Sequence, residues 1–167
     1  KDSGTYFSKS EAQEVIDDYF RQFKMLKKWL EDKKLEISKH GHIYSIFGRK
    51  RRLPNVHSSD QGVASHEVRS GINFLVQSTA SDVNLLGAID MNSYIKEHGL
   101  KSKIFALVHD SILAEVPDHE VEHYCTRLKE FIQKPRQGCV IKGAPIGCDF
   151  DIGQDYSFGK FEKTYEA

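Results

Sequence analysis

The sequence predicts an α+β fold in which long helices pack on a small antiparallel sheet. Apolar residues recur at helical intervals along 9–39 and again along 64–98. Two short runs rich in apolar and β-branched residues, 103–109 and 112–116, almost touch in sequence, which is typical of a β-hairpin. With 167 residues, 39% of them hydrophobic, the chain is long and apolar enough to bury a core.

The N-terminal part of the chain is expected to hold one long helix and a basic turn. Residues 1–7 lack a period and are interpreted as a linker. Ser8 and Glu11 have the spacing of a capping box, so a helix over 9–39 begins after Ser8, and Gly41 ends it. A strand over 43–47 then leads into a basic turn and a second short strand within 48–54.

The C-terminal part is expected to alternate helices and strands around one hairpin. Asp110 and Ser111 form the tip of that hairpin. The other predicted elements are, in chain order, a polar loop over 55–63, a helix over 64–98, a helix over 118–133, a loop over 134–144 and a half-buried strand over 145–152.

The formal net charge of zero is the sum of two segments of opposite sign. Residues 24–53 carry 10 basic and 3 acidic side chains, whereas residues 54–125 carry 4 basic and 10 acidic ones. A uniformly basic protein that coats nucleic acid is therefore excluded, but a local site for a polyanion and a metal ion fits the division. A solvated, charged helix face is the alternative that charge alone leaves open.

Composition excludes two further classes of protein. No apolar run approaches the roughly 20 residues that span a bilayer, so no membrane partner is expected. Cys125, Cys139 and Cys148 are odd in number and lack CxxC spacing, which argues against a disulfide framework. Reduced thiols in a cytoplasmic protein are the expected state.

The second long helix carries an unusual polar stripe. Arg69, Asn73 and Gln77 are spaced four residues apart and therefore share one helix face. Amides and guanidinium groups donate to the purine N3 and pyrimidine O2 acceptors of the minor groove, which every correct base pair presents. The stripe is a candidate reader of base-pair shape, although exposed amides at this spacing also arise by chance.

Asp110 is the candidate metal ligand. A tight turn at the hairpin tip would project its carboxylate beyond the strand ends. Magnesium typically takes one or two carboxylates together with substrate oxygens and water. The alternative is a turn residue that only bonds to its own backbone.

Four stretches of the chain, in order, resemble motifs of the family A DNA polymerases, the DNA polymerase I and phage polymerase type. Residues 10–20 resemble the finger helix that follows the nucleotide-binding helix. Residues 48–54 (GRKRRLP) resemble the GRRRxLP turn, and residues 69–82 resemble the RxxxNxxxQGTAAD helix. Residues 107–117 resemble motif C, and residues 145–150 fit the final palm strand.

The resemblance implies two regions and a set of roles. Residues 1–63 would be the C-terminal part of the fingers, and residues 64–167 a palm portion with motif C. Asp110 matches a catalytic aspartate that binds two Mg²⁺ ions, and His109 matches a residue beside the primer terminus. The minor-groove and basic-segment contacts to DNA would come from Arg69, Asn73, Gln77, Arg51 and Arg52.

The function implied by the resemblance is template-directed deoxynucleotidyl transfer on a primer–template with a dNTP substrate. Two metal ions about 3.5–4 Å apart would activate the primer 3′-hydroxyl and stabilise the leaving pyrophosphate. One carboxylate cannot hold two ions, and neither the family's other catalytic aspartate (motif A) nor its nucleotide-binding helix has a match in this sequence. We therefore expect the chain alone to be inactive and to need a preceding segment or a partner chain.

The start of the chain at Lys1, without an initiator Met, agrees with a missing N-terminal portion. A naturally split polymerase, an intein-type processing product and an excised fragment are all left open. Ser111 stands where the family usually has Glu, and Ser78 where it usually has Gly. Ser111 does not exclude activity. Ser78 adds a side chain where the family usually has none, so its environment shows how closely that helix packs.

Two other functions are left open by the sequence. The first is a non-catalytic DNA-binding relic of a polymerase. The second is a small metal-dependent phosphodiesterase that uses Asp110 with Asp149 and Asp151, which requires the three carboxylates to lie close together.

Overall fold

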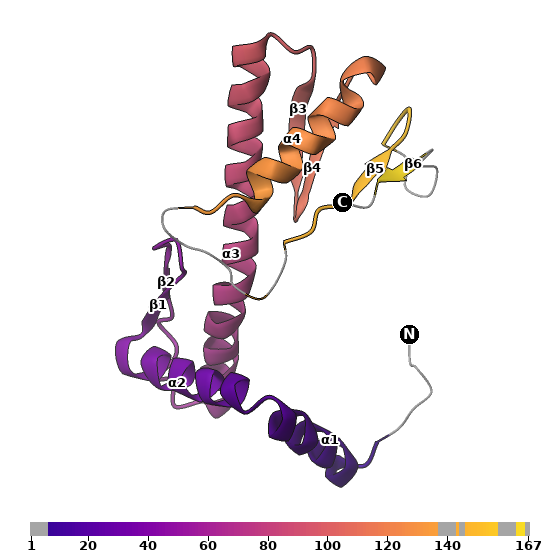
Figure 1. Cartoon of the computed structure of the whole chain (residues 1–167). Coiled ribbons are helices and arrows are strands. Elements are labelled where there is room, and N and C mark those ends of the chain that lie inside the picture. The colour runs from indigo at the N-terminus through magenta and orange to yellow at the C-terminus, as the bar shows by residue number, and fades with distance from the viewer. Residues whose placement is uncertain (1–6, 137–142, 144–145, 157–162, 166–167) are drawn as a thin grey trace. The chain divides into compact units, whose positions relative to one another are not determined.

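A computed structural model describes residues 7–136, 143, 146–156 and 163–165 (Figure 1). The described residues form long helices and two-stranded antiparallel sheets, paired β1–β2, β3–β4 and β5–β6. The predicted α+β class is confirmed, but the expected single sheet is three separate ribbons. The predicted linker over 1–7 and most of the loop over 134–144 lie outside the described residues.

The chain divides into two compact units. The first comprises residues 1–44 and 50–75, and the second comprises residues 45–49 and 76–167. Helix α3 (Gln61–His98) is continuous and contributes to both. The predicted division into a fingers part (residues 1–63) and a palm part (residues 64–167) concerns function and stays a prediction.

The first unit begins with a capped helix, as predicted. The Ser8 side chain accepts a hydrogen bond from the Glu11 amide at 3.3 Å, and the Glu11 carboxylate accepts one from the Ser8 amide at 2.8 Å. The prediction of one helix over 9–39 is wrong, because α1 (Lys9–Gln22) and α2 (Lys24–His40) are separated at Phe23. Phe23 adopts φ −109° and ψ 59°, outside the helical region, and no Gly or Pro marks the break.

Helix α2 ends where the sequence predicts. Gly41 has φ 62°, and its amide bonds to the carbonyl of Ile37, which is an αL cap. Strands β1 (His42–Tyr44) and β2 (Lys50–Arg52) then pair antiparallel. The core of this unit consists of the buried residues Ile37, Ile43, Leu53 and Val56, with Val68, Ile72, Phe74 and Leu75 packed against them.

The second unit contains the predicted hairpin. Strands β3 (Lys103–Val108) and β4 (Ser111–Glu115) pair antiparallel, followed by a 3₁₀ turn η1 (Asp118–Glu120) and α4 (Val121–Gln133). The strand predicted over 145–152 is shorter, since β5 spans Phe150–Ile152, and its partner β6 (Lys163–Tyr165) was not predicted. Of the cysteines, Cys125 and Cys148 are free, and Cys139 lies outside the described residues.

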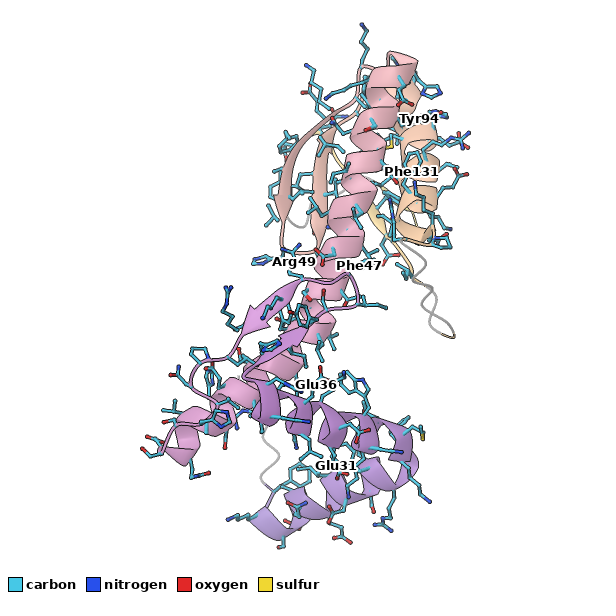
Figure 2. The ribbon with its side chains drawn as sticks, turned by 90° about the vertical axis from the view of Figure 1, so that its left-hand side faces the viewer. Glu31, Glu36, Phe47, Arg49, Tyr94 and Phe131 are labelled. Carbon is cyan, nitrogen blue, oxygen red and sulfur yellow. The ribbon has the colours of Figure 1, made fainter. Side chains whose placement is uncertain are left out.

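Helix α4 and the β3–β4 hairpin pack on the C-terminal half of α3 (Figure 1). Tyr94 of α3 and Phe131 of α4 meet edge to face at 5.7 Å between ring centroids (Figure 2). The buried core residues are Val83, Met91, Ile95, Tyr124, Leu128 and Ile132, and Ile104, Ile112 and Ala114 of the hairpin pack against them. The scaffold of the hairpin is therefore a helix pair with a continuous apolar interior.

Helix α3 differs in detail from its prediction. It begins at Gln61 rather than 64, because the Asp60 side chain accepts hydrogen bonds from the amides of Gly62 and Val63 at 2.7 and 3.2 Å. Val76 and Val83 lie seven residues apart, in the same sector of a regular helix, yet Val76 is 63% exposed whereas Val83 is buried. The helix thus buries different sectors in its two halves.

The buried carboxylate of Glu120 fixes the approach to β3. It accepts hydrogen bonds from the amides of Lys101 and Ser102, both at 2.9 Å, and from the Ser102 hydroxyl at 2.6 Å. The Lys101 amide and the Ser102 hydroxyl hold the pKa of Glu120 below its ordinary value. The link between α3 and β3 is therefore tied to the start of α4.

We predict that Gly87→Ala destabilises the protein by about 1–2 kcal/mol, because an overpacked methyl group costs more than the helix gains from Ala. A Cβ at Gly87 would lie 2.7 Å from the Ile132 side chain and 3.4 Å from its Cα. Gly147→Ala is the control, because a Cβ there meets nothing within 4 Å. Urea unfolding measures both variants, and an unchanged midpoint for Gly87→Ala would contradict the close packing of α3 and α4.

We predict that Glu120→Gln lowers the melting temperature at pH 7 and flattens its decline in acid. A carboxylate whose pKa is lowered by folding adds stability above its ordinary pKa of 4.5, and that stability is lost as pH falls through the lowered value. The exposed neighbour Glu122, changed to Gln, is the control. Thermal melts between pH 3 and pH 7 that superimpose for Glu120→Gln and the parent would disprove the role of this carboxylate.

Candidate functional site

Asp110 lies in a two-residue turn at the tip of the β3–β4 hairpin. The last paired residues are Val108 and Ser111, and His109 and Asp110 connect them. His109 has φ 54°, in the left-handed region that histidine enters more readily than most residues. Both side chains are exposed, and neither makes a hydrogen bond or ion pair within the described part of the chain. The carboxylate predicted as a metal ligand is thus exposed and unneutralised.

The described residues contain no group of three or more His, Cys, Asp or Glu side chains that could hold a metal ion. Asp110, Asp149 and Asp151 are all described, so they do not form the cluster that the phosphodiesterase alternative requires. One carboxylate together with ligands from outside the described residues still fits the way Mg²⁺ binds near phosphates.

The polar stripe lies on one exposed face of α3, and the shared face agrees with the spacing of its three residues. Arg69, Asn73 and Gln77 are exposed on successive turns of one continuous helix. Within the described residues none of the three side chains has a hydrogen-bond or ionic partner. Their donors are therefore available to a ligand, which is the state that minor-groove recognition requires.

Arg51 and Arg52, both predicted to contact DNA, lie on opposite faces of the β1–β2 hairpin. Arg51 pairs in register with the buried Ile43, donates to the Ser70 hydroxyl at 2.7 Å and lies over the Phe74 ring. Arg52 pairs in register with His42 and is exposed. Of the two, Arg52 has no side-chain partner among the described residues and can meet a phosphate, whereas Arg51 contacts Ser70 and Phe74 of α3.

An ion pair that the sequence did not reveal connects two of the quoted motifs. Arg49, in the basic turn, donates through Nε to Asp82 Oδ2 at 3.3 Å and through Nη2 to Asp82 Oδ1. Asp82 is 6% exposed, and its hydrogen bond holds the pKa of Arg49 above its ordinary value. Figure 2 shows Arg49 beside the middle of α3, next to Phe47, which packs against the core of the second unit.

Arg49 lies in the GRKRRLP turn and Asp82 at the end of the 69–82 motif, but spacing alone does not pair residues 33 positions apart. The signal available in the sequence was an acid placed directly before Val83, in the apolar sector of a helix. A carboxylate at such a position needs a partner, since a buried unpaired charge is costly. The basic turn supplies that partner.

Ser78, which stands where the family usually has Gly, is buried, so α3 accommodates its Cβ. Its hydroxyl oxygen has no hydrogen-bond partner among the described residues. An unsatisfied buried hydroxyl costs about 1–3 kcal/mol. The helix packing therefore leaves room for the Ser78 side chain but provides no hydrogen-bond partner for its hydroxyl among the described residues.

The comparisons with known proteins agree with this geometry. The sequence model described as DNA polymerase family A matches residues 3–157. A DNA polymerase of Escherichia phage T5 is 46% identical over 164 residues, which is 95% of this chain and 19% of that protein. DNA polymerase I of Bacillus caldotenax is 29% identical over 149 residues, which is 89% of this chain and 16% of that protein.

Among solved structures, the POL domain of Pol1 from M. smegmatis, in complex with DNA primer-template and dNTP, matches with a TM-score of 0.72 and 30% identity. The match covers 76% of this chain and 22% of that one. The chain belongs to DNA polymerase family A. It spans less than a fifth of the length of these two curated relatives.

In the part of the chain that the structure describes, no helix combines the length and the apolar character needed to cross a membrane.

We predict that Arg49→Met lowers the melting temperature by roughly 5 °C, because it leaves a buried carboxylate without its partner. Arg52→Met makes the same chemical change at an exposed arginine that has no ion pair within the described residues, and it is the matched control. Replacing both partners, in Arg49→Met/Asp82→Leu, recovers part of the loss. Equal melting temperatures for Arg49→Met and Arg52→Met would show that the pair does not stabilise the fold.

Proposed function

We propose that this chain is the C-terminal fingers and palm portion of a DNA-directed DNA polymerase, which acts in the cytoplasm of a bacterial or phage-infected cell. The observation that carries the proposal is the exposed carboxylate of Asp110, which has no partner among the described residues, on a tight two-residue turn in the stretch that resembles motif C. The donors of Arg69, Asn73 and Gln77 on α3, which also have no partner in the described part of the chain, support it.

The proposed reaction is template-directed deoxynucleotidyl transfer. Asp110 would bind Mg²⁺ together with an aspartate from outside this chain, and bound metal would neutralise charge on the primer hydroxyl and the triphosphate. His109 would lie beside the primer terminus, because the turn fixes it next to Asp110. The stripe on α3 would donate to the minor groove of the newest base pairs and so test their shape.

Activity is proposed to require the remainder of the polymerase, with motif A and the nucleotide-binding helix. A single carboxylate cannot hold two metal ions, and this chain corresponds to 19% of its phage T5 relative. The exposed apolar side chains of the first unit support a large partner surface. No residue of α1 is buried, and the exposed set on α1, α2 and the residue between them comprises Val15, Ile16, Tyr19, Phe23, Met25, Leu26 and Leu35.

We predict that the 167-residue chain does not extend a primer and that mixing it with the preceding polymerase segment produces extension. In that assembly, Asp110→Asn lowers the rate at least about a hundredfold, because the charge that holds the metal is removed. Asp149→Asn, at another exposed aspartate, leaves the rate unchanged. Gel-based primer extension with Mg²⁺ compares the parent assembly with the assemblies that carry Asp110→Asn or Asp149→Asn. The isolated chain is assayed in the same way.

Two outcomes would contradict the proposal. Extension by the isolated chain that is lost in Asp110→Asn would disprove the need for a partner. An assembly that binds primer–template but never extends it would favour the alternative of a DNA-binding relic.

A further inference from the structure

The outward face of the β1–β2 hairpin, together with the last residue of α2, carries aromatic rings and cations side by side. We call this set the hairpin ladder and define it as His40, His42, Tyr44, Lys50 and Arg52. All five belong to the first unit, and His42 is half-buried while the other four are exposed. None of the functional roles considered so far uses the rings of this ladder.

Strand register determines which side chains share this face. His42 lies opposite Arg52, and Tyr44 lies opposite Lys50. Because side chains alternate along a strand, and directly paired residues share a face, these four point to one side. The intervening pair, Ile43 and Arg51, points to the other side, where Ile43 is buried.

The rings form a continuous row. The centroids of His40 and His42 are 5.9 Å apart, and those of His42 and Tyr44 are 5.4 Å apart. The ring planes meet at 55° and 89°, so neighbouring rings are not stacked in parallel on one another. Lys50 Nζ lies 5.4 Å from the Tyr44 centroid, and Tyr44 remains 50% exposed. The row therefore presents partly exposed aromatic surface, with the Lys50 ammonium over the Tyr44 ring.

The cations of the ladder are not neutralised by the part of the chain that the structure describes. Residues 37–59 contain no Asp or Glu, and although Arg49 of this stretch pairs with Asp82, Lys39, Lys50 and Arg52 have no carboxylate partner among the described residues. An ordinary solvated face mixes both signs of charge, so this surface is suited to a polyanion.

We propose that the hairpin ladder binds an unpaired DNA strand, with bases against the rings and phosphates against Lys50 and Arg52. Aromatic platforms beside basic side chains are the general means of binding single strands, because every base offers a π-face. A duplex does not fit this chemistry, since its bases are already stacked and cannot meet the rings. The inference rests on the proposed function only in taking DNA as the ligand, and it adds a site distinct from the minor-groove stripe.

The test compares two fluorescent DNA probes on the full 167-residue chain by anisotropy. One is an oligothymidylate of about 12 nucleotides, and the other is a blunt duplex. His42→Val/Tyr44→Val removes both rings but keeps residues that favour strands. We expect this variant to bind the oligothymidylate about tenfold more weakly and the duplex unchanged. Lys50→Gln/Arg52→Gln should reduce the slope of log affinity against log salt by about 1.4 for the oligothymidylate.

Two controls separate the ladder from other causes. Tyr19→Ala removes an equally exposed ring of the same unit that no cation covers, and it leaves oligothymidylate affinity unchanged. Gln77→Ala shows the opposite selectivity, with weaker duplex binding and unchanged oligothymidylate binding. Circular dichroism melts of each variant confirm that it is folded.

Unchanged oligothymidylate affinity in His42→Val/Tyr44→Val, with the protein folded, would overturn the proposal. An equal loss for both probes would also overturn it, since it would indicate a general electrostatic contact. Tighter binding of oligouridylate than of oligothymidylate would refute the assignment to DNA. The two proposals can fail separately. If the ladder variants lose oligothymidylate binding but the assembly never extends a primer, the proposed function is contradicted and the ladder proposal is supported.

Discussion

The continuity of α3 is the constraint on which the rest of the structure depends. A single helix over Gln61–His98 contributes to the cores of both units and carries the polar stripe on its outside. It can do so because glycines let other segments approach its backbone. A Cβ at Gly71 would lie 2.6 Å from Leu53, and one at Gly87 would collide with Ile132. The ion pair between Arg49 and Asp82 adds a polar contact between these apolar ones.

Features governed by local sequence could be predicted, and those governed by distant contacts could not. The capping box at Ser8, the αL cap at Gly41 and the β3–β4 hairpin each depend on residues a few positions apart, and all three are confirmed. The break at Phe23 escaped prediction because the apolar period continues through it without a breaker residue. The exposure of Val76 escaped because the partners of a helix face, not its period, decide which sector is buried.

The candidate site likewise has features that could be predicted from local sequence and features that depend on distant contacts. Asp110 and the stripe were located from spacing, and the structure shows them exposed and without partners among the residues that it describes. The different situations of Arg51 and Arg52 follow from strand register, which the sequence of one strand does not specify. The pairing of Arg49 with Asp82 spans 33 positions and two elements, so only folding brings the charges together.

The number of residues in the turn at His109 and Asp110 determines where the Asp110 carboxylate lies. Side chains in a strand alternate with a strict period of two, so one residue added to or removed from the turn would shift the pairing of β3 with β4 by one place. Such a shift would exchange the inward and outward residues of a whole strand and carry the carboxylate to a different position. The number of residues in the turn is therefore constrained together with the identity of Asp110, and a deletion here would be more damaging than most substitutions elsewhere in the hairpin.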